Sequence, residues 1–228
     1  MRLKKLLTTA TASAALIVGV AASPAQASHA WGPYHWSTTD GVARLTVYSS
    51  LTPDWGGNLS TANSDWNAST HLQNSVVAGS TTTTARKRCA MPAGAIRICN
   101  AAYGSTGWAG LASINTADGT HISQASAKMN DTYLSGSGAA ERQGVMCQEV
   151  GHDFGLDHQD TSFTNANLGT CMDYTNDWST NQHPNAHDFA ELDTIYGHVD
   201  RVAALPAAQP GTSTIRTGTT VTIITWAS

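Results

Sequence analysis

The sequence lacks long apolar runs beyond its first 22 residues and carries little charge. A membrane-spanning helix needs about 18 or more consecutive apolar residues, so the rest of the chain excludes one. Only 12% of the residues are charged, with 12 Lys and Arg against 16 Asp and Glu. This acidic balance argues against nucleic acid and anionic membranes as partners.

The first 27 residues have the composition of a secretory signal peptide. A basic start precedes an apolar segment over residues 6–22, and Ala25 and Ala27 frame a small-residue cleavage site. An uncleaved N-terminal anchor is the alternative interpretation. Cleavage after Ala27 removes three basic residues and leaves nine against sixteen acidic ones. The sequence therefore predicts a secreted, extracellular protein that has no membrane attachment after signal removal.

The sequence also lacks any C-x-x-C pair, which argues against a thiolate zinc site. Its four cysteines are an even number in an oxidising compartment, which favours two disulfides, and three pairings are possible. We favour Cys89–Cys99, which closes a short loop. The accompanying Cys147–Cys171 bond would tie the zinc-ligand stretch described below to a downstream turn.

Hydrophobic periodicity predicts one mixed domain over residues 28–200, which begins with an arm rich in Trp, Tyr and His. The basic run at residues 86–88 is expected to be a solvated loop, and Asn58 and Pro184 are expected to start two of the helices. Residues 201–228 form a tail whose β-prone end could add an edge strand. Strands are predicted at 42–51, 76–77, 95–100, 108–114 and 121–129, and helices at 59–68, 139–154 and 184–197.

The end of the helix predicted at 139–154 has the spacing of a catalytic zinc site. Gln148 and His152 lie one helical turn apart on one face, with Glu149 beside them. Gly155 can adopt a positive φ and reverse the chain, which would return His158 as a third ligand. Three protein ligands and one open position are typical of a catalytic zinc ion.

This stretch resembles the metzincin signature H-E-x-x-H-x-x-G-x-x-H, here in the variant form Q-E-x-x-H-x-x-G-x-x-H, followed by a Met-turn at Met172. The resemblance implies an α+β fold with a mixed, mostly parallel sheet over an active-site helix, a Met-turn and a C-terminal helix. It also implies one Zn²⁺ per chain, an apolar floor at Met172, and Glu149 as general base. Tyr174 matches a tyrosine that stabilises the oxyanion in astacin-like members.

The function that the resemblance implies is a secreted zinc endopeptidase, acting as a monomer on peptide or protein substrates. By the same resemblance, the substrate backbone would pair with a strand near residues 107–114. The alternative is a catalytically inactive scaffold that binds a peptide or protein. A carbohydrate-binding module is a third class, supported only by scattered Trp residues.

Several alternatives concern the metal. Gln148 could ligate weakly through its amide oxygen, another group could replace it, or the metal could be lost. His183 or His187 are the candidate replacements. Asp157 and Asp160 could orient the ligand histidines or remain solvated, and His29 with His35 in the arm could form a second metal site.

Overall fold

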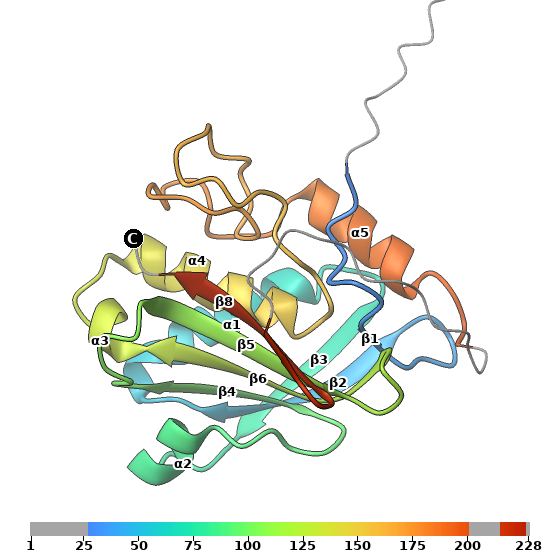
Figure 1. Ribbon diagram of the computed structural model, residues 1–228, viewed down its shortest axis with the longest axis horizontal. Coiled ribbons are helices and arrows are strands. Elements are labelled where there is room, and N and C mark those ends of the chain that lie inside the picture. The colour runs from blue at the N-terminus through green and yellow to red at the C-terminus, as the bar shows by residue number, and fades with distance from the viewer. Residues whose placement is uncertain (1–26, 201–214, 227–228) are drawn as a thin grey trace, which may run out of the picture.

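The computed structural model describes residues 27–200 and 215–226, which form one mixed sheet with helices on both faces (Figure 1). The signal peptide expected over residues 1–27 lies outside this part of the chain, except for residue 27. In the described part of the chain, no helix is long and apolar enough to span a membrane.

The sheet runs in the order β3-β2-β4-β6-β5-β8-β7, and β1 pairs with the start of β6. Strands β1, β2, β3, β4 and β6 are parallel, whereas β5 is antiparallel to both of its neighbours, β6 and β8. The strands are β1 (His35–Trp36), β2 (Ala43–Ser50), β3 (Leu72–Ala78), β4 (Ile96–Ala101), β5 (Trp108–Thr116), β6 (His121–Asn130), β7 (Ile215–Thr217) and β8 (Thr220–Trp226).

The helices are η1 (Pro53–Trp55), α1 (Gly56–Trp66), α2 (Thr83–Arg88), α3 (Asp131–Leu134), α4 (Ala139–His152) and α5 (Ala186–Tyr196). Helices α1 and α4 pack together, and α4 also packs on β5 and β6. Helix α2 lies on the other face, because Cys99 points away from the core side of β4 and is bonded to Cys89 at the end of α2.

The structure confirms the predicted α+β class with a mixed, mostly parallel sheet. Each predicted strand and helix has a counterpart, with ends displaced by a few residues. Strand β1 is an addition, because two paired residues are too short to give an alternating pattern.

Three local predictions were wrong. The basic run at residues 86–88 belongs to helix α2, where the Thr82 side chain accepts a hydrogen bond from the Ala85 N–H and caps the first turn. Helix α1 begins at Gly56, directly after the 3₁₀ turn η1, so Asn58 lies inside it. Helix α5 is capped by Asn185 in a capping box with Asp188, and Pro184 precedes the cap.

The hydrophobic core fills the space between the sheet and the two large helices. Trp66 on α1 is fully buried, and its indole N–H donates a 3.1 Å hydrogen bond to the Cys147 carbonyl of α4. Cys147 is bonded to Cys171, so α4 is attached covalently to the segment that contains Met172. The carboxyl-terminal half of α4 is therefore held rigidly between the sheet and the downstream loops.

Candidate metal centre and peptide-binding edge

The sharp turn after α4 brings two histidines together. Gly155 follows the helix with φ +92°, and a Cβ at this position would collide with the Tyr34 carbonyl of the arm. Glycine is therefore required both for the backbone angle and for the close approach. The turn returns the chain so that His158 faces the last residue of α4, His152.

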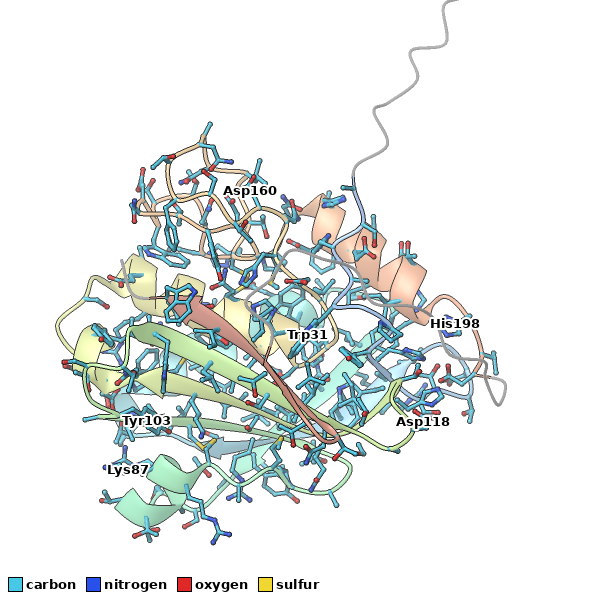
Figure 2. The ribbon with its side chains drawn as sticks, viewed as in Figure 1. Trp31, Lys87, Tyr103, Asp118, Asp160 and His198 are labelled. Carbon is cyan, nitrogen blue, oxygen red and sulfur yellow. A yellow bond between two sulfur atoms is a disulfide. The ribbon has the colours of Figure 1, made fainter. Side chains whose placement is uncertain are left out.

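His152 and His158 are buried and meet through their Nε2 atoms, which lie 3.1 Å apart. The Nδ1 atom of His152 lies 2.8 Å from the Leu156 carbonyl, so Nδ1 carries the hydrogen and Nε2 keeps its lone pair. Burial lowers the pKa of His152 to about 3, which keeps this imidazole neutral. Trp31 of the arm packs edge-on against His152, with ring centroids 6.0 Å apart (Figure 2).

Gln148 is fully buried on the same face of α4, one turn before His152. Its amide oxygen accepts a 2.6 Å hydrogen bond from the Thr225 hydroxyl, and its amide nitrogen has no hydrogen-bond partner in the described part of the chain. Thr225 belongs to the tail, 77 residues further along the chain. The amide oxygen of Gln148 thus accepts its hydrogen bond from the tail of the chain.

Glu149 is also fully buried, and its carboxylate lies against strand β5 at Gly110, where a Cβ would collide with it. Within the described residues neither carboxylate oxygen has a hydrogen-bond partner. Burial raises the pKa of Glu149 to about 8. Thr225 and the Ala112 backbone lie close enough to oppose this shift, but neither forms a hydrogen bond of acceptable geometry with the carboxylate. A nearby cation would favour the ionised carboxylate instead.

Tyr174 and Met172 lie on the side of the site formed by the downstream turn. The Tyr174 ring packs on His158 with centroids 4.3 Å apart, and its hydroxyl donates a 2.9 Å hydrogen bond to the Ile224 carbonyl. Burial raises the pKa of Tyr174, so the hydroxyl keeps its proton. Met172 is fully buried beneath α4, and its sulfur lies 2.6 Å from where a Cβ on Gly151 would be.

The edge of β5 that faces this site is occupied by the chain's own tail. Strand β8 pairs antiparallel with β5 from Trp108↔Trp226 to Asn115↔Thr220, and Figure 1 shows it crossing in front of α4. Its Ile224 carbonyl and Thr225 hydroxyl bond Tyr174 and Gln148 respectively. The tail therefore contacts Gln148 and Tyr174 and occupies the edge at residues 107–114 on which a substrate was expected.

Residues 219–226 could be predicted as a β-prone segment, but the strand with which they pair could not. The roles of Thr225, Ile224 and Gly110 at the site were missed, because strand pairing across more than 100 residues leaves no local pattern.

The alternative ligands from the sequence have other partners. His183 is exposed and pairs with Asp65 at 2.7 Å, and His187 stacks on His29 with ring centroids 4.7 Å apart. His29 and His35 do not share a site, because His29 contacts Asp188 at 3.0 Å whereas His35 contacts Asp200.

The two candidate orienting aspartates differ. Asp157 lies 3.4 Å from the Nδ1 atom of His158 and accepts a 2.7 Å hydrogen bond from the His158 N–H, so it can fix this imidazole. Asp160 instead accepts a hydrogen bond from the Ser162 N–H on the loop that projects above α4 (Figure 2).

Two of the three protein ligands that a catalytic zinc ion needs are in place. In a tetrahedral zinc site, ligand atoms are about 3.3–3.4 Å apart, close to the 3.1 Å between the Nε2 atoms of His152 and His158. Among the described residues no third His, Cys, Asp or Glu converges on this pair. Gln148, buried one helical turn before His152, is therefore the residue whose oxygen would complete the set.

Comparisons with known proteins were made for sequence and for structure. No protein-family model and no curated protein matches the sequence. Among solved structures, the fold is similar to myroilysin, in one structure at 11% identity and TM-score 0.41, covering 71% of this chain and 86% of that one. A second myroilysin structure gives 14% identity and TM-score 0.40, covering 71% and 96%.

A further similar structure is high choriolytic enzyme 1, a hatching enzyme zinc-protease from the medaka fish Oryzias latipes. It has 10% identity and TM-score 0.40, and the match covers 72% of this chain and 94% of that one. Likenesses at this level carry no functional argument, so the function proposed below rests on this chain's own side chains.

Proposed function

We propose that this protein is a secreted zinc-dependent endopeptidase, and that strand β8 of its own tail closes the active site in this structure. The observation that carries the proposal is the convergence at a strand edge of two buried imidazoles, a tyrosine hydroxyl and a buried carboxylate that has no hydrogen-bond partner among the described residues. These are a metal-binding pair, a general base and an oxyanion donor, the groups that metal-assisted peptide hydrolysis requires.

His152 and His158 would hold the zinc ion, with the Gln148 amide oxygen as the third protein ligand. A bound zinc ion supplies Lewis acidity, which polarises a peptide carbonyl and acidifies a water molecule. Glu149 would accept a proton from the attacking water and return it to the leaving amine. Its burial against Gly110 keeps bulk water away from this proton transfer.

The position of a substrate follows from the contacts of β8. Tyr174 donates its hydroxyl hydrogen to the Ile224 carbonyl, a backbone oxygen of a strand paired with β5. A peptide on the same edge would present a backbone carbonyl to the same hydroxyl, where Tyr174 would stabilise negative charge as it develops on oxygen. Strand β8 thus occupies the place of a substrate, and turnover requires that it leave.

The proposal is tested by casein cleavage with and without a chelator, in the wild type and in Glu149→Gln. The expected result is chelator-sensitive cleavage by the wild type and loss of about 100-fold or more in the variant, the lower range for a general base. Glu141→Gln, at a partly buried position in the first turn of the same helix, is the matched control and should keep full activity. Cleavage that survives in Glu149→Gln would exclude this carboxylate as the base.

A second candidate is a non-catalytic scaffold that binds an extended peptide at the β5 edge. The observation in its favour is that Thr225 already takes the Gln148 amide oxygen, which leaves the metal with two imidazoles. Here the tail-deleted protein would bind peptides but cleave none, with or without added zinc. Chelator-sensitive cleavage by that variant would exclude this candidate.

A further inference from the structure

A second group of histidines lies at the opposite end of the sheet from β8's terminus, away from the site described above. Three Nε2 atoms approach one carboxylate oxygen, Oδ1 of Asp200: that of His35 at 3.0 Å, that of His198 at 3.1 Å and that of His121 at 3.5 Å. We call these four residues the His35 cluster. They come from β1, the start of β6 and the segment after α5, three parts of the chain that are distant in sequence.

The hydrogen positions in the His35 cluster call for a cation. The Nδ1 atom of His35 lies 2.9 Å from the Pro33 carbonyl, and the Nδ1 atom of His121 lies 2.6 Å from the Asp118 carboxylate. Each contact requires a hydrogen on Nδ1, because carbonyl and carboxylate oxygens only accept. In a neutral His35 ring the one N–H is on Nδ1, so its Nε2 directs a lone pair toward a negatively charged oxygen. A positive ion between this Nε2 and Asp200 turns the repulsion into attraction. His121 differs, because burial opposes but the carboxylates of Asp118 and Asp200 raise its pKa, so its protonated ring can donate to both.

The dimensions of the cluster fit a tetrahedral ion. Zinc–nitrogen and zinc–oxygen bonds of about 2.0–2.2 Å place neighbouring ligand atoms about 3.3–3.4 Å apart. The Nε2 atoms of His35 and His198 lie 3.0 and 3.1 Å from the Asp200 oxygen, and these three ligand atoms all lie within 4.8 Å of one another. The Nε2 atom of His121 lies 3.5 Å from the same oxygen but does not belong to this group. A carbonyl behind His35 is a usual partner of a metal-bound histidine.

An ion can reach this position from solvent. The cluster lines a cavity of about 370 Å³ between the arm, the β5–β6 turn and the end of α5. Asp200 and His35 are largely buried, with side chains 8% and 12% exposed, whereas His198 is 49% exposed. Figure 2 shows Asp118 and His198 at the same end of the molecule. The buried ligands could therefore hold the ion while His198 completes the set from the outer side.

We propose that the His35 cluster holds a structural zinc ion on His35, His198 and Asp200, with two imidazole ligands and one carboxylate ligand. Two nitrogen donors disfavour calcium and magnesium, which prefer oxygen, and favour the zinc class of divalent ions. The ion would attach the arm to the sheet and to the segment after α5, in addition to the hydrogen bond from the Thr38 N–H to Asp200. This site is independent of the proposed peptidase activity.

The test measures zinc bound per chain by equilibrium dialysis and mass spectrometry, with zinc alone as the probe. His198→Asn removes an outer ligand that is too exposed to be needed for folding, and His183→Asn, which removes another exposed histidine paired with an aspartate, is the matched control. The expected result is one zinc ion fewer in His198→Asn than in the wild type, and no change in His183→Asn.

Asp118→Asn is a second control, because it alters only the group behind His121, which is not one of the three ligands. It should leave zinc binding at this site nearly unchanged. Zinc should also raise the Tm of His158→Asn, which lacks a ligand of the peptidase site, but should not raise it in His158→Asn/His198→Asn. Equal zinc content in wild type and His198→Asn would overturn the proposal and leave a salt-bridged cluster, whatever the outcome of the casein assay.

Discussion

Removal of the tail strand is the most informative perturbation of this molecule. A chain that ends at residue 214 lacks β7 and β8 but keeps Asp200 and the whole of α5. Under the proposed function it exposes the β5 edge and frees the hydroxyl of Tyr174 and the amide oxygen of Gln148. We expect kcat/KM for a short peptide to rise, because only the open form can bind substrate.

The two hydrogen bonds from the site to β8 set a lower limit for the size of this effect. Each contributes about 0.5–1.5 kcal/mol net, so the pair favours the closed form by about 1–3 kcal/mol, or about 5- to 150-fold. The ladder with β5 and the buried side chains of Val221 and Ile223 add to this, against the entropy of ordering the strand. Thr225→Val removes one hydrogen bond at nearly constant shape and should raise kcat/KM by about 2- to 13-fold.

The assay is cleavage of a fluorogenic peptide at substrate concentrations below KM, with circular dichroism and Tm as checks that each variant is folded. Thr194→Val is the matched control, because it removes a threonine hydrogen bond on the exposed face of α5 and should leave kcat/KM unchanged. A folded deletion variant with the same chelator-sensitive kcat/KM as the full chain would refute the closing role of β8. Absence of cleavage in both proteins would instead count against the peptidase.

Two further substitutions test the residues that shape the site. Gln148→His should increase the chelator concentration needed for half-inactivation by about tenfold or more, because imidazole is a better zinc ligand than an amide oxygen; an unchanged concentration would show that residue 148 does not face the metal. Gly155→Ala should lower the free energy of unfolding by more than Gly169→Ala does. Both glycines have positive φ, so alanine adds a strain of about 1–2 kcal/mol at either position. Of the two positions, only 155 also lacks space for a Cβ. Equal losses in denaturant titrations would contradict the collision with the arm.

The parts of the fold that could be predicted from sequence are those whose apolar residues are periodic. Strand β4 was found because Ile96 and Ile98 lie on one face, and helix α4 because its apolar residues form a stripe, although all of residues 143–152 are buried. Helix α2 was missed because it buries none of its residues, so its sequence has no apolar stripe. The start of α1 was misplaced because Gly56 and Gly57 are poor helix formers, yet they continue the turn that η1 has begun.

The candidate site likewise has a local part that could be predicted from sequence and a long-range part that could not. His152, Gly155 and His158 come together within one helix and one turn, so spacing alone predicts their contact. The hydrogen bond between Gln148 and Thr225 spans 77 residues, and the contact between His35 and Asp200 spans 165 residues. Such contacts depend on the register of the sheet, which sequence periodicity does not determine.

The position of Gln148 links closure to metal binding under the proposed function. The Thr225 hydroxyl occupies one of the two lone pairs of the Gln148 amide oxygen, so this oxygen is a weaker zinc ligand while β8 is paired, and β8 and zinc oppose each other. Linkage requires that this opposition be reciprocal: zinc weakens the closed form by the same factor by which closure weakens zinc binding. With one hydrogen bond at stake, Thr225→Val should raise zinc affinity at His152 and His158 by about 2- to 13-fold. Deletion of the tail should raise zinc affinity little further than Thr225→Val does, because the opposing donor is already gone in that variant. Chelator titrations of the wild type, Thr225→Val and the deletion variant measure this coupling, and equal zinc affinity in the wild type and Thr225→Val would disprove it.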